Sequence, residues 1–186
     1  RHNIINITGC IAVAMKLGVG FQQIQSAINQ FKGIDRRFTI YRHPSDVVVI
    51  DDYAHHPTEI KNTLKAARLL CNGKLIVVFE PHRYSRIIDL YDEFINSFFD
   101  ADILFVTKIY SAGEKQIADI NEKIIVNSIK KMGHKNVKCF KDEKCMEVEL
   151  YEVSSSNDFI IFLGAGSISK KARSMEESML KIIRKN

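Results

Sequence analysis

The sequence has few of the features that mark membrane, secreted or disulfide-stabilised proteins. It contains no tryptophan, three prolines and four cysteines in 186 residues. Its longest apolar runs are about five residues, whereas a membrane-spanning helix needs about 20. The chain does not begin with a charged stretch followed by an apolar segment, which is the pattern of a secretion signal. We therefore expect a cytoplasmic protein that does not bind membranes.

The cysteines also lack a paired spacing that would suggest disulfides or a zinc site. We expect four reduced thiols, most of them buried as small apolar side chains. They are Cys10, Cys71, Cys139 and Cys145.

The charge balance is only mildly basic. Twenty-seven basic and 22 acidic residues give a net charge of +5 and a pI of about 9.0. The basic residues are scattered, and no long basic run alternates with aromatic residues as a nucleic-acid surface would require. The composition therefore favours a small anionic ligand over nucleic acid.

The most informative stretch is a short apolar run that ends in polar residues. Val47–Ile50 are four branched apolar residues, which is typical of a strand buried on both faces. Ligands bind outside the carboxyl ends of strands in open α/β sheets, so the polar residues that follow predict a site. They are Asp51, Asp52, Tyr53, His55 and His56, with Pro57 suited to begin a helix.

Two other interpretations of this stretch remain open. Asp and His are common in turns, so part of the cluster could be structural. A metal-dependent hydrolase using Asp51, Asp52, His55 and His56 is a weaker alternative. The rings of neighbouring histidines diverge, and no HxxxH or CxxC spacing supports zinc, so we predict no metal ligands in this chain.

The order of elements predicts an α/β protein with a mostly parallel sheet covered by helices on both faces. A short helical segment comes first, with helices at 3–17 and 21–31 and a boundary at Gly33. A strand at 36–42 then forms a hairpin with 47–50. Further strands are predicted at 75–79, 103–106, 137–140 and 159–163, and helices at 57–71, 85–99, 117–132, 143–153 and 167–184.

Three further corners follow apolar strands. Arg83 and Arg86 are three residues apart at a helix start, where they could grip a carboxylate or phosphate. The corner 110–114, YSAGE, could line a ligand or could be a simple glycine turn. GAG at 164–166 is weak evidence for a phosphate site, and GxxxxGK[ST] is missing from the sequence. If the protein uses ATP, its main phosphate cradle would therefore lie outside this chain.

Taken together, these motifs resemble the Mur ligase family, and within it the enzymes that join L-alanine to UDP-N-acetylmuramate. The match runs in order over almost the whole chain. It consists of RHNIIN at 1–6, RRF at 36–38, DDYAHHPTEI at 51–60, EPHRYSR at 80–86, YSAGE at 110–114 and GAGSI at 164–168.

The resemblance implies that the chain is one part of a larger enzyme. Residues 1–32 would be the last helices of a central ATPase domain, and residues 33–186 the complete C-terminal Rossmann-like domain. The chain also lacks an initiator methionine. We expect the missing N-terminal and central domains to be its partners, and the fragment alone to be inactive.

The implied reaction belongs to peptidoglycan precursor synthesis, and thus to cell-wall biogenesis, cell shape and cell division. With ATP and Mg²⁺ the family activates the muramoyl carboxylate as an acyl phosphate, which the amino group of L-alanine then attacks. Closing the C-terminal domain over this labile intermediate would exclude water.

The resemblance also assigns roles to individual residues. Asn3 and Asn6 would lie beside the adenine, and Arg37 and Asp52 near the phosphates and ribose of ATP. A second set would form the L-alanine pocket, with an arginine on its carboxylate: Tyr53, His55, His82, Arg83 and Arg86.

Within that pocket His55 would lie near the amino group of L-alanine. Because an ammonium must lose a proton before it attacks, we expect His55 to be the proton acceptor.

Two alternatives to this function remain. The related ligase that attaches a recycled tripeptide to the same sugar shares DDYAHHP, and Ala54 leans slightly towards it, whereas PHRYSR at 81–86 argues against it. The other alternative is a non-catalytic nucleotide- or anion-binding module.

Overall fold

The computed structural model divides the chain into two compact units, Arg1–Ile34 and Asp35–Asn186. The structure describes residues 2–31, 33–42 and 46–183, with side chains at 4–31, 33–41 and 46–175. The turn expected at 43–45 therefore lies outside the described residues. Below, the two parts are called the N-terminal unit and the C-terminal unit.

The N-terminal unit consists of two helices that contact each other, α1 (His2–Lys16) and α2 (Phe21–Gln30). Both were expected, with bounds that differ by one residue at some ends. Gly18 ends α1 with φ of +81°, a conformation that glycine adopts without steric cost. The unit carries exposed apolar side chains, among them Ile4 and Leu17.

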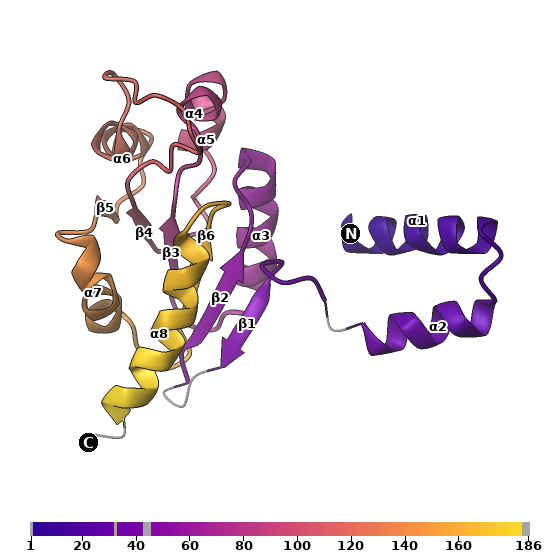
Figure 1. Cartoon of the computed structure of the whole chain (residues 1–186). Helices are drawn as coiled ribbons and strands as arrows, with labels where there is room; N and C mark the ends of the chain where they lie inside the picture. Colours follow the sequence, from indigo (N-terminus) through magenta and orange to yellow (C-terminus); the bar gives the residue numbers. More distant parts are fainter. Residues whose placement is uncertain (1, 32, 43–45, 184–186) are drawn as a thin grey trace. The chain divides into compact units, whose positions relative to one another are not determined.

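The C-terminal unit is built on one sheet of six strands in the order β1-β2-β6-β3-β4-β5 (Figure 1). β1 pairs antiparallel with β2, and every other pairing is parallel. The expected α/β fold with a mostly parallel sheet is thus confirmed, as is the first hairpin. The strands are β1 (Thr39–Arg42), β2 (Val48–Asp52), β3 (Leu75–Phe79), β4 (Ile103–Val106), β5 (Val137–Cys139) and β6 (Phe159–Leu163).

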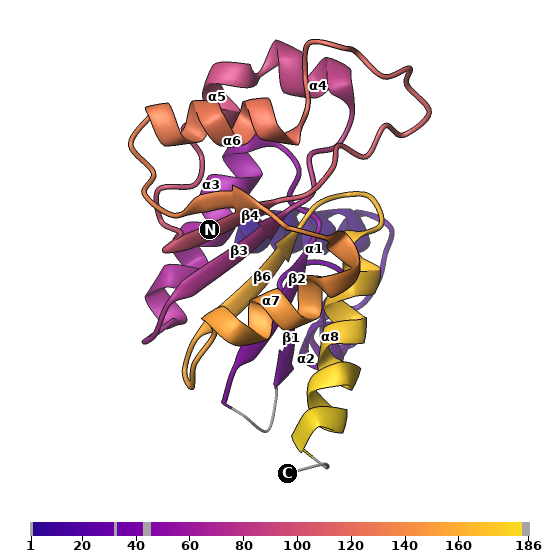
Figure 2. The same ribbon diagram turned by 90° about the vertical axis from the view of Figure 1, so that its left-hand side faces the viewer.

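Helices cover both faces of this sheet. Figure 2 shows α7 and α8 in front of the strands and α3 behind them. Side chains alternate along β3, so that Val77 packs with the α3 side of the core and Val78 with the α8 side. The helices are α3 (Pro57–Leu70), α4 (Tyr84–Asp89), α5 (Tyr91–Ile95), α6 (Glu122–Lys131), α7 (Met146–Val153) and α8 (Ile168–Ile183).

Three expected helices differ from the observed ones. The helix predicted at 143–153 is a 3-10 helix at Glu143–Cys145 followed by α7 from Met146. The single helix predicted at 85–99 is two short helices, because Leu90 leaves the helical conformation at φ −118° and ψ 23°. The helix predicted from Ile117 begins only at Glu122. Asn121 caps it, since its side-chain oxygen accepts hydrogen bonds from the backbone N–H of Lys123 and Ile124.

The expectation that most cysteines are buried was wrong. Cys71 is buried, but Cys139 is half-buried and Cys10 and Cys145 are exposed. Cys10 faces outward on α1 because a two-helix unit has little interior in which to bury it.

Within the described residues, no helix combines the length and the apolar character needed to cross a bilayer.

Candidate functional site

The polar corners meet at the carboxyl ends of three neighbouring strands, β2, β6 and β3. The helices after β2 and β6 lie on opposite faces of the sheet, since α3 packs in one core cluster and α8 in the other. A parallel sheet opens a crevice where successive helices diverge in this way, and ligands bind there. The expected corners after Asp52, Phe79 and Leu163 therefore share one edge of the sheet.

Four aromatic side chains form a continuous row along this edge. The Tyr53 and His55 ring centroids are 5.1 Å apart, and those of His55 and His82 are 5.8 Å apart. Tyr110 extends the row, stacked on His82 at 5.3 Å with an interplanar angle of 14°. Of these, Tyr53, His55 and His82 were predicted as site residues, so the structure brings them together from two corners.

The hydrogen bonds of His55 determine which of its nitrogens is free. Nδ1 lies 2.9 Å from the carbonyl oxygen of Tyr53, which can only accept, so Nδ1 carries the hydrogen. The Glu59 carboxylate lies 3.5 Å from the same nitrogen. In the neutral ring the lone pair therefore lies on Nε2, which can accept a proton.

His82 has the opposite arrangement. The guanidinium of Arg86, which can only donate, lies 3.1 Å from Nδ1 and 3.2 Å from the His82 carbonyl oxygen. Nδ1 is therefore the acceptor, and Nε2 carries the hydrogen. Burial, followed by the positive charges of Arg86, His55 and Arg83, lowers the pKa of His82. His82 is thus a neutral hydrogen-bond donor at pH 7.

Arg83 and Arg86 do not act as a parallel pair in this structure. Arg86 turns back over His82, whereas Arg83 lies 3.9 Å from the Glu114 carboxylate. Glu114 also accepts hydrogen bonds from the N–H and hydroxyl of Ser85 at the start of α4. Arg83 adopts a left-handed backbone with φ of +70°, which is costly for a side chain of this kind.

The adjacent aspartates point to opposite faces of the sheet. Asp51 bonds to the Ser169 hydroxyl of α8, and Asp52 lies 3.3 Å from the Thr63 hydroxyl of α3. Asp52 also accepts from the N–H of Phe38 and Ala54, both at 2.8 Å. The two carboxylates therefore cannot chelate one ion together, as the hydrolase alternative would require.

Both aspartates are buried in the polar framework of the site. Among the described residues, Asp52 accepts three hydrogen bonds, and a carboxylate can accept about four. Asp51 keeps Oδ1 without a hydrogen-bond partner. Burial raises the pKa of Asp51 and of Asp52, against the opposing effect of their hydrogen bonds.

His56 has a structural role as the N-cap of α3. Its Nδ1 accepts from the N–H of Thr58 at 3.3 Å, and its own N–H donates to Glu59. Glu59 is also an ion-pair partner of Arg37, whose side chain is half-exposed at 51% and lies over the Tyr53 ring. His56 thus has the structural role expected of a turn residue, whereas His55 is part of the row of rings.

The loop before α8 is filled by the chain's own carboxylate. Glu80 accepts from the Ser167 hydroxyl at 2.8 Å and from the Ile168 N–H at 3.3 Å. From the other side Arg36 donates to the carbonyl oxygens of Gly164 and Gly166. The GAG corner, considered as a weak phosphate site, is therefore already occupied by Glu80.

Sequence reasoning did not name Glu80 or Arg36 as site residues, and it left open whether the corner that holds Tyr110 lines a ligand. All three lie in the motifs quoted above, and Arg36 is next to the predicted Arg37. Membership in these motifs was the available signal, but their bonding partners are about 30 to 130 residues away in the chain.

Other predicted residues lie elsewhere. Asn6 is an exposed residue of α1 in the N-terminal unit, and the side chain of Asn3 lies outside the described residues. In the described part of the chain, no group of three or more His, Cys, Asp or Glu side chains could hold a metal ion.

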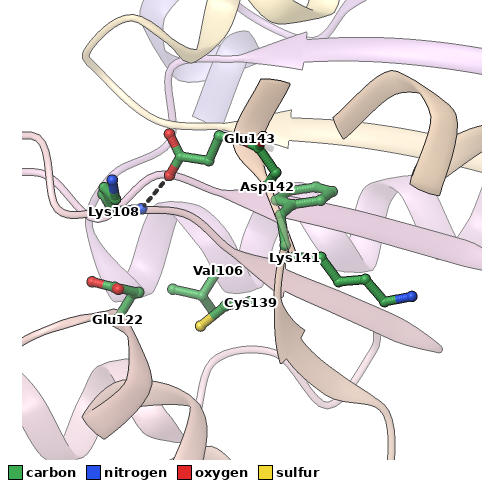
Figure 3. Close-up of a pocket in the computed structure, with 8 residues that line it drawn as sticks. Val106, Lys108, Glu122, Cys139, Lys141, Asp142 and Glu143 are labelled. Atoms are coloured by element: carbon green, nitrogen blue, oxygen red, sulfur yellow. Dashed lines mark hydrogen bonds between the residues drawn. The ribbon is translucent and has the colours of Figure 1, made fainter. Parts of the chain in front are cut away.

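A separate hollow of about 160 Å³ opens at the carboxyl ends of β4 and β5 (Figure 3). Lys108, Glu122 and Cys139 are among the residues that line it (Figure 3). Glu143 accepts a hydrogen bond from the Lys108 N–H at 3.0 Å. None of the predicted site residues belongs to its lining.

The fold is a Rossmann-like domain of the type found in one family of ligases. Residues 36–166 match the family described as Mur ligase, glutamate ligase domain. The chain belongs to the Mur ligase family.

Within the family, the chain is similar to UDP-N-acetylmuramate–L-alanine ligases. It is 45% identical over 180 residues to such a ligase of Rickettsia felis. The aligned region covers 95% of this chain and 38% of the relative. It is also similar to the crystal structure of the ligase MurC from Thermotoga maritima, with 32% identity and a TM-score of 0.73. The match covers 97% of this chain and 38% of the MurC chain.

A murein peptide ligase of Psychrobacter arcticus shares the fold, with a TM-score of 0.69 and 21% identity over 97% of this chain and 36% of its own. The chain thus spans well under half the length of each of these proteins.

Proposed function

We propose that the chain is the C-terminal part of a longer, ATP-dependent, cytoplasmic ligase that joins L-alanine to UDP-N-acetylmuramate. In this proposal residues 1–32 are the last helices of a central ATPase domain, and residues 33–186 form the C-terminal domain. The exposed apolar side chains of the N-terminal unit, such as Ile4 at 70% and Leu17 at 77%, support a partner surface in the remainder of the protein.

The observation that carries the proposal is the free Nε2 of His55 beside His82 and two arginines. An amino acid contains one carboxylate and one ammonium, about 3 Å apart, and the site offers cations next to a proton acceptor. Arg83 or Arg86 binds the carboxylate, and the His82 Nε2–H donates a further hydrogen bond. His55 takes the proton that the ammonium must lose before it attacks.

Tyr53 supports this arrangement in two ways. Its carbonyl oxygen fixes the tautomer of His55, and its ring packs edge-on against the imidazole. Because the acceptor is a backbone carbonyl oxygen, a side-chain substitution at Tyr53 does not remove it. The tautomer of His55 is therefore set by the backbone of the β2–α3 corner.

The described residues fit the phosphates of ATP poorly. The amino end of α8 is occupied by Glu80, and the sequence lacks GxxxxGK[ST]. ATP supplies the phosphoryl group that activates the muramoyl carboxylate. We assign its main contacts, and those of Mg²⁺, to the protein beyond this chain, with Arg37 near the phosphates, Asp52 near the ribose, and Asn3 and Asn6 beside the adenine.

The test is phosphate release from ATP by the full-length protein, with UDP-N-acetylmuramate and either L-alanine, a tripeptide or no acceptor. Release that depends on L-alanine, with the 186-residue chain inactive in parallel, is the expected result. Release driven by the tripeptide would identify a recycling ligase instead. Release without any acceptor, or none at all, would favour a nucleotide- or anion-binding module.

A further inference from the structure

Tyr110 completes the row of rings although no role has been assigned to it. We propose that Tyr110 determines acceptor specificity, because its ring forms a fixed wall that limits the size of the amino-acid side chain. The inference rests on the proposed function, since it concerns the acceptor of that reaction.

The backbone of Tyr110 is fixed to the corner that carries the predicted site residues. Its N–H donates to the Pro81 carbonyl oxygen at 2.8 Å, and its carbonyl oxygen accepts from the Arg83 N–H at 2.9 Å. Tyr110 and His82 thereby form an isolated parallel bridge. The residue moves only if that corner moves with it.

The ring of Tyr110 is also confined from both sides. One face stacks on His82. On another side lies Gly166, where an added Cβ would come within 2.6 Å of Tyr110 Cγ and 2.8 Å of Cδ2. Gly166 is itself held, because Arg36 binds its carbonyl oxygen. The ring therefore has little room to retreat from a larger ligand.

Tyr110 remains accessible to a ligand, since 41% of the residue is exposed. An acceptor that has its carboxylate on Arg83 or Arg86 and its nitrogen at His55 Nε2 lies along the ring row. Its side chain then projects beside His82 and Tyr110. A rigid aromatic surface at this position admits a methyl group and excludes larger side chains by contact.

The test is the acceptor profile of the full-length protein, measured as kcat/KM for L-alanine, L-serine and L-valine. In Tyr110→Ala, the ratio for L-valine relative to L-alanine should rise by at least about 10-fold, the effect of one methylene or more in a tight pocket. Tyr110→Phe should keep the wild-type ratio. Tyr151→Ala removes the same atoms from a comparably exposed position on α7, at 47%, and should also keep it.

Tyr110→Leu provides a second variant if Tyr110→Ala does not fold, and thermal melting identifies that case. The leucine side chain lacks the flat ring and should shift the ratio in the same direction. Equal losses for all three acceptors, with an unchanged ratio, would show that Tyr110 is only structural. If the wild-type protein does not use L-alanine, the proposed function is wrong. That result differs from a failure of the Tyr110 proposal, in which the wild type is active and the ratio does not change.

Discussion

Nδ1 of His55 lies 2.9 Å from the carbonyl oxygen of Tyr53, which leaves Nε2 as the free nitrogen of the ring. A carbonyl cannot donate, so this contact alone is enough to fix the tautomer, and the Glu59 carboxylate 3.5 Å from the same nitrogen favours the same one. The proton-acceptor role proposed for His55 depends on this bond.

The first prediction concerns His55→Gln in the full-length protein. Removal of a general base usually lowers turnover by about 100-fold or more, so kcat with L-alanine should fall while the affinity for ATP changes little. His56→Asn is the matched control, because asparagine is also a good N-cap and should preserve α3 and activity. A His55→Gln variant with wild-type turnover would exclude the base role.

The second prediction concerns Glu59, which accepts from the N–H of His55 and His56 at the start of α3. Burial raises its pKa, but these bonds and the charges of His55 and Arg37 together lower it below the usual value. A lowered carboxyl pKa contributes stability that is present above the unfolded-state pKa and is lost as pH falls through the folded-state value.

Glu59→Gln should therefore be less stable than wild type by about 0.5 kcal/mol at pH 7, because glutamine can still accept both hydrogen bonds but lacks the negative charge at the start of the helix. The difference should shrink below about pH 4. Urea unfolding of the 186-residue chain at several pH values measures it, with Glu152→Gln as a control for loss of a surface charge. A difference that stays constant down to pH 3 would contradict the linkage.

The third prediction concerns Asp51, whose contribution to stability should depend on pH in the opposite direction. Burial raises the pKa of Asp51, whereas the Ser169 hydrogen bond and the charge of Arg36 oppose this effect. The folded state then holds the proton more tightly than the unfolded chain, so the contribution of Asp51 to stability falls as pH rises from about 4.

Because Asp51→Asn does not titrate, the stability of wild type relative to this variant should decrease between pH 4 and pH 8. The same urea experiment measures it, and Asp119→Asn in an exposed loop controls for loss of one charge. An increase over this pH range would show that Asp51 is stabilised as a charged group.

The fourth prediction concerns the close approach at Gly166. In Gly166→Ala the new Cβ would lie 2.5 Å from Glu80 Oε1 and 2.6 Å from Tyr110 Cγ. We expect a loss of about 1–3 kcal/mol in the free energy of unfolding, as for other overpacked sites. Gly9→Ala, where a Cβ meets nothing within 4 Å, should not destabilise α1. Equal stability of Gly166→Ala and wild type would contradict the packing argument.

The sheet was predictable from sequence because its strands are short and uniformly apolar. β3 at Leu75–Phe79, β4 at Ile103–Val106 and β6 at Phe159–Leu163 have the bounds that their apolar runs indicate. Such strands are buried on both faces, so local composition and tertiary burial agree.

The errors arose where the chain departs from a regular period. Leu90 interrupts a helix although its composition gives no warning, and the loop before Asn121 contains apolar residues that imitate helical spacing. The helix start at Glu122 follows from the cap at Asn121, which sequence reasoning could have used.

The candidate site was predictable only in part. Motif residues such as His55 and His82 were identified, but their tautomers follow from a backbone carbonyl and from Arg86, which are tertiary contacts. The contact between Tyr110 and Gly166 joins residues 56 positions apart, so no local pattern could reveal it.

The Glu80 carboxylate has one further consequence. It bonds to the Ser167 hydroxyl and the Ile168 N–H, groups that open-sheet proteins commonly offer to phosphate. Inorganic phosphate, sulfate and free nucleotides abound in any living cell, and a vacant helix start would collect them. With the Glu80 carboxylate in place, the Ser167 hydroxyl and the Ile168 N–H are not available to such an anion.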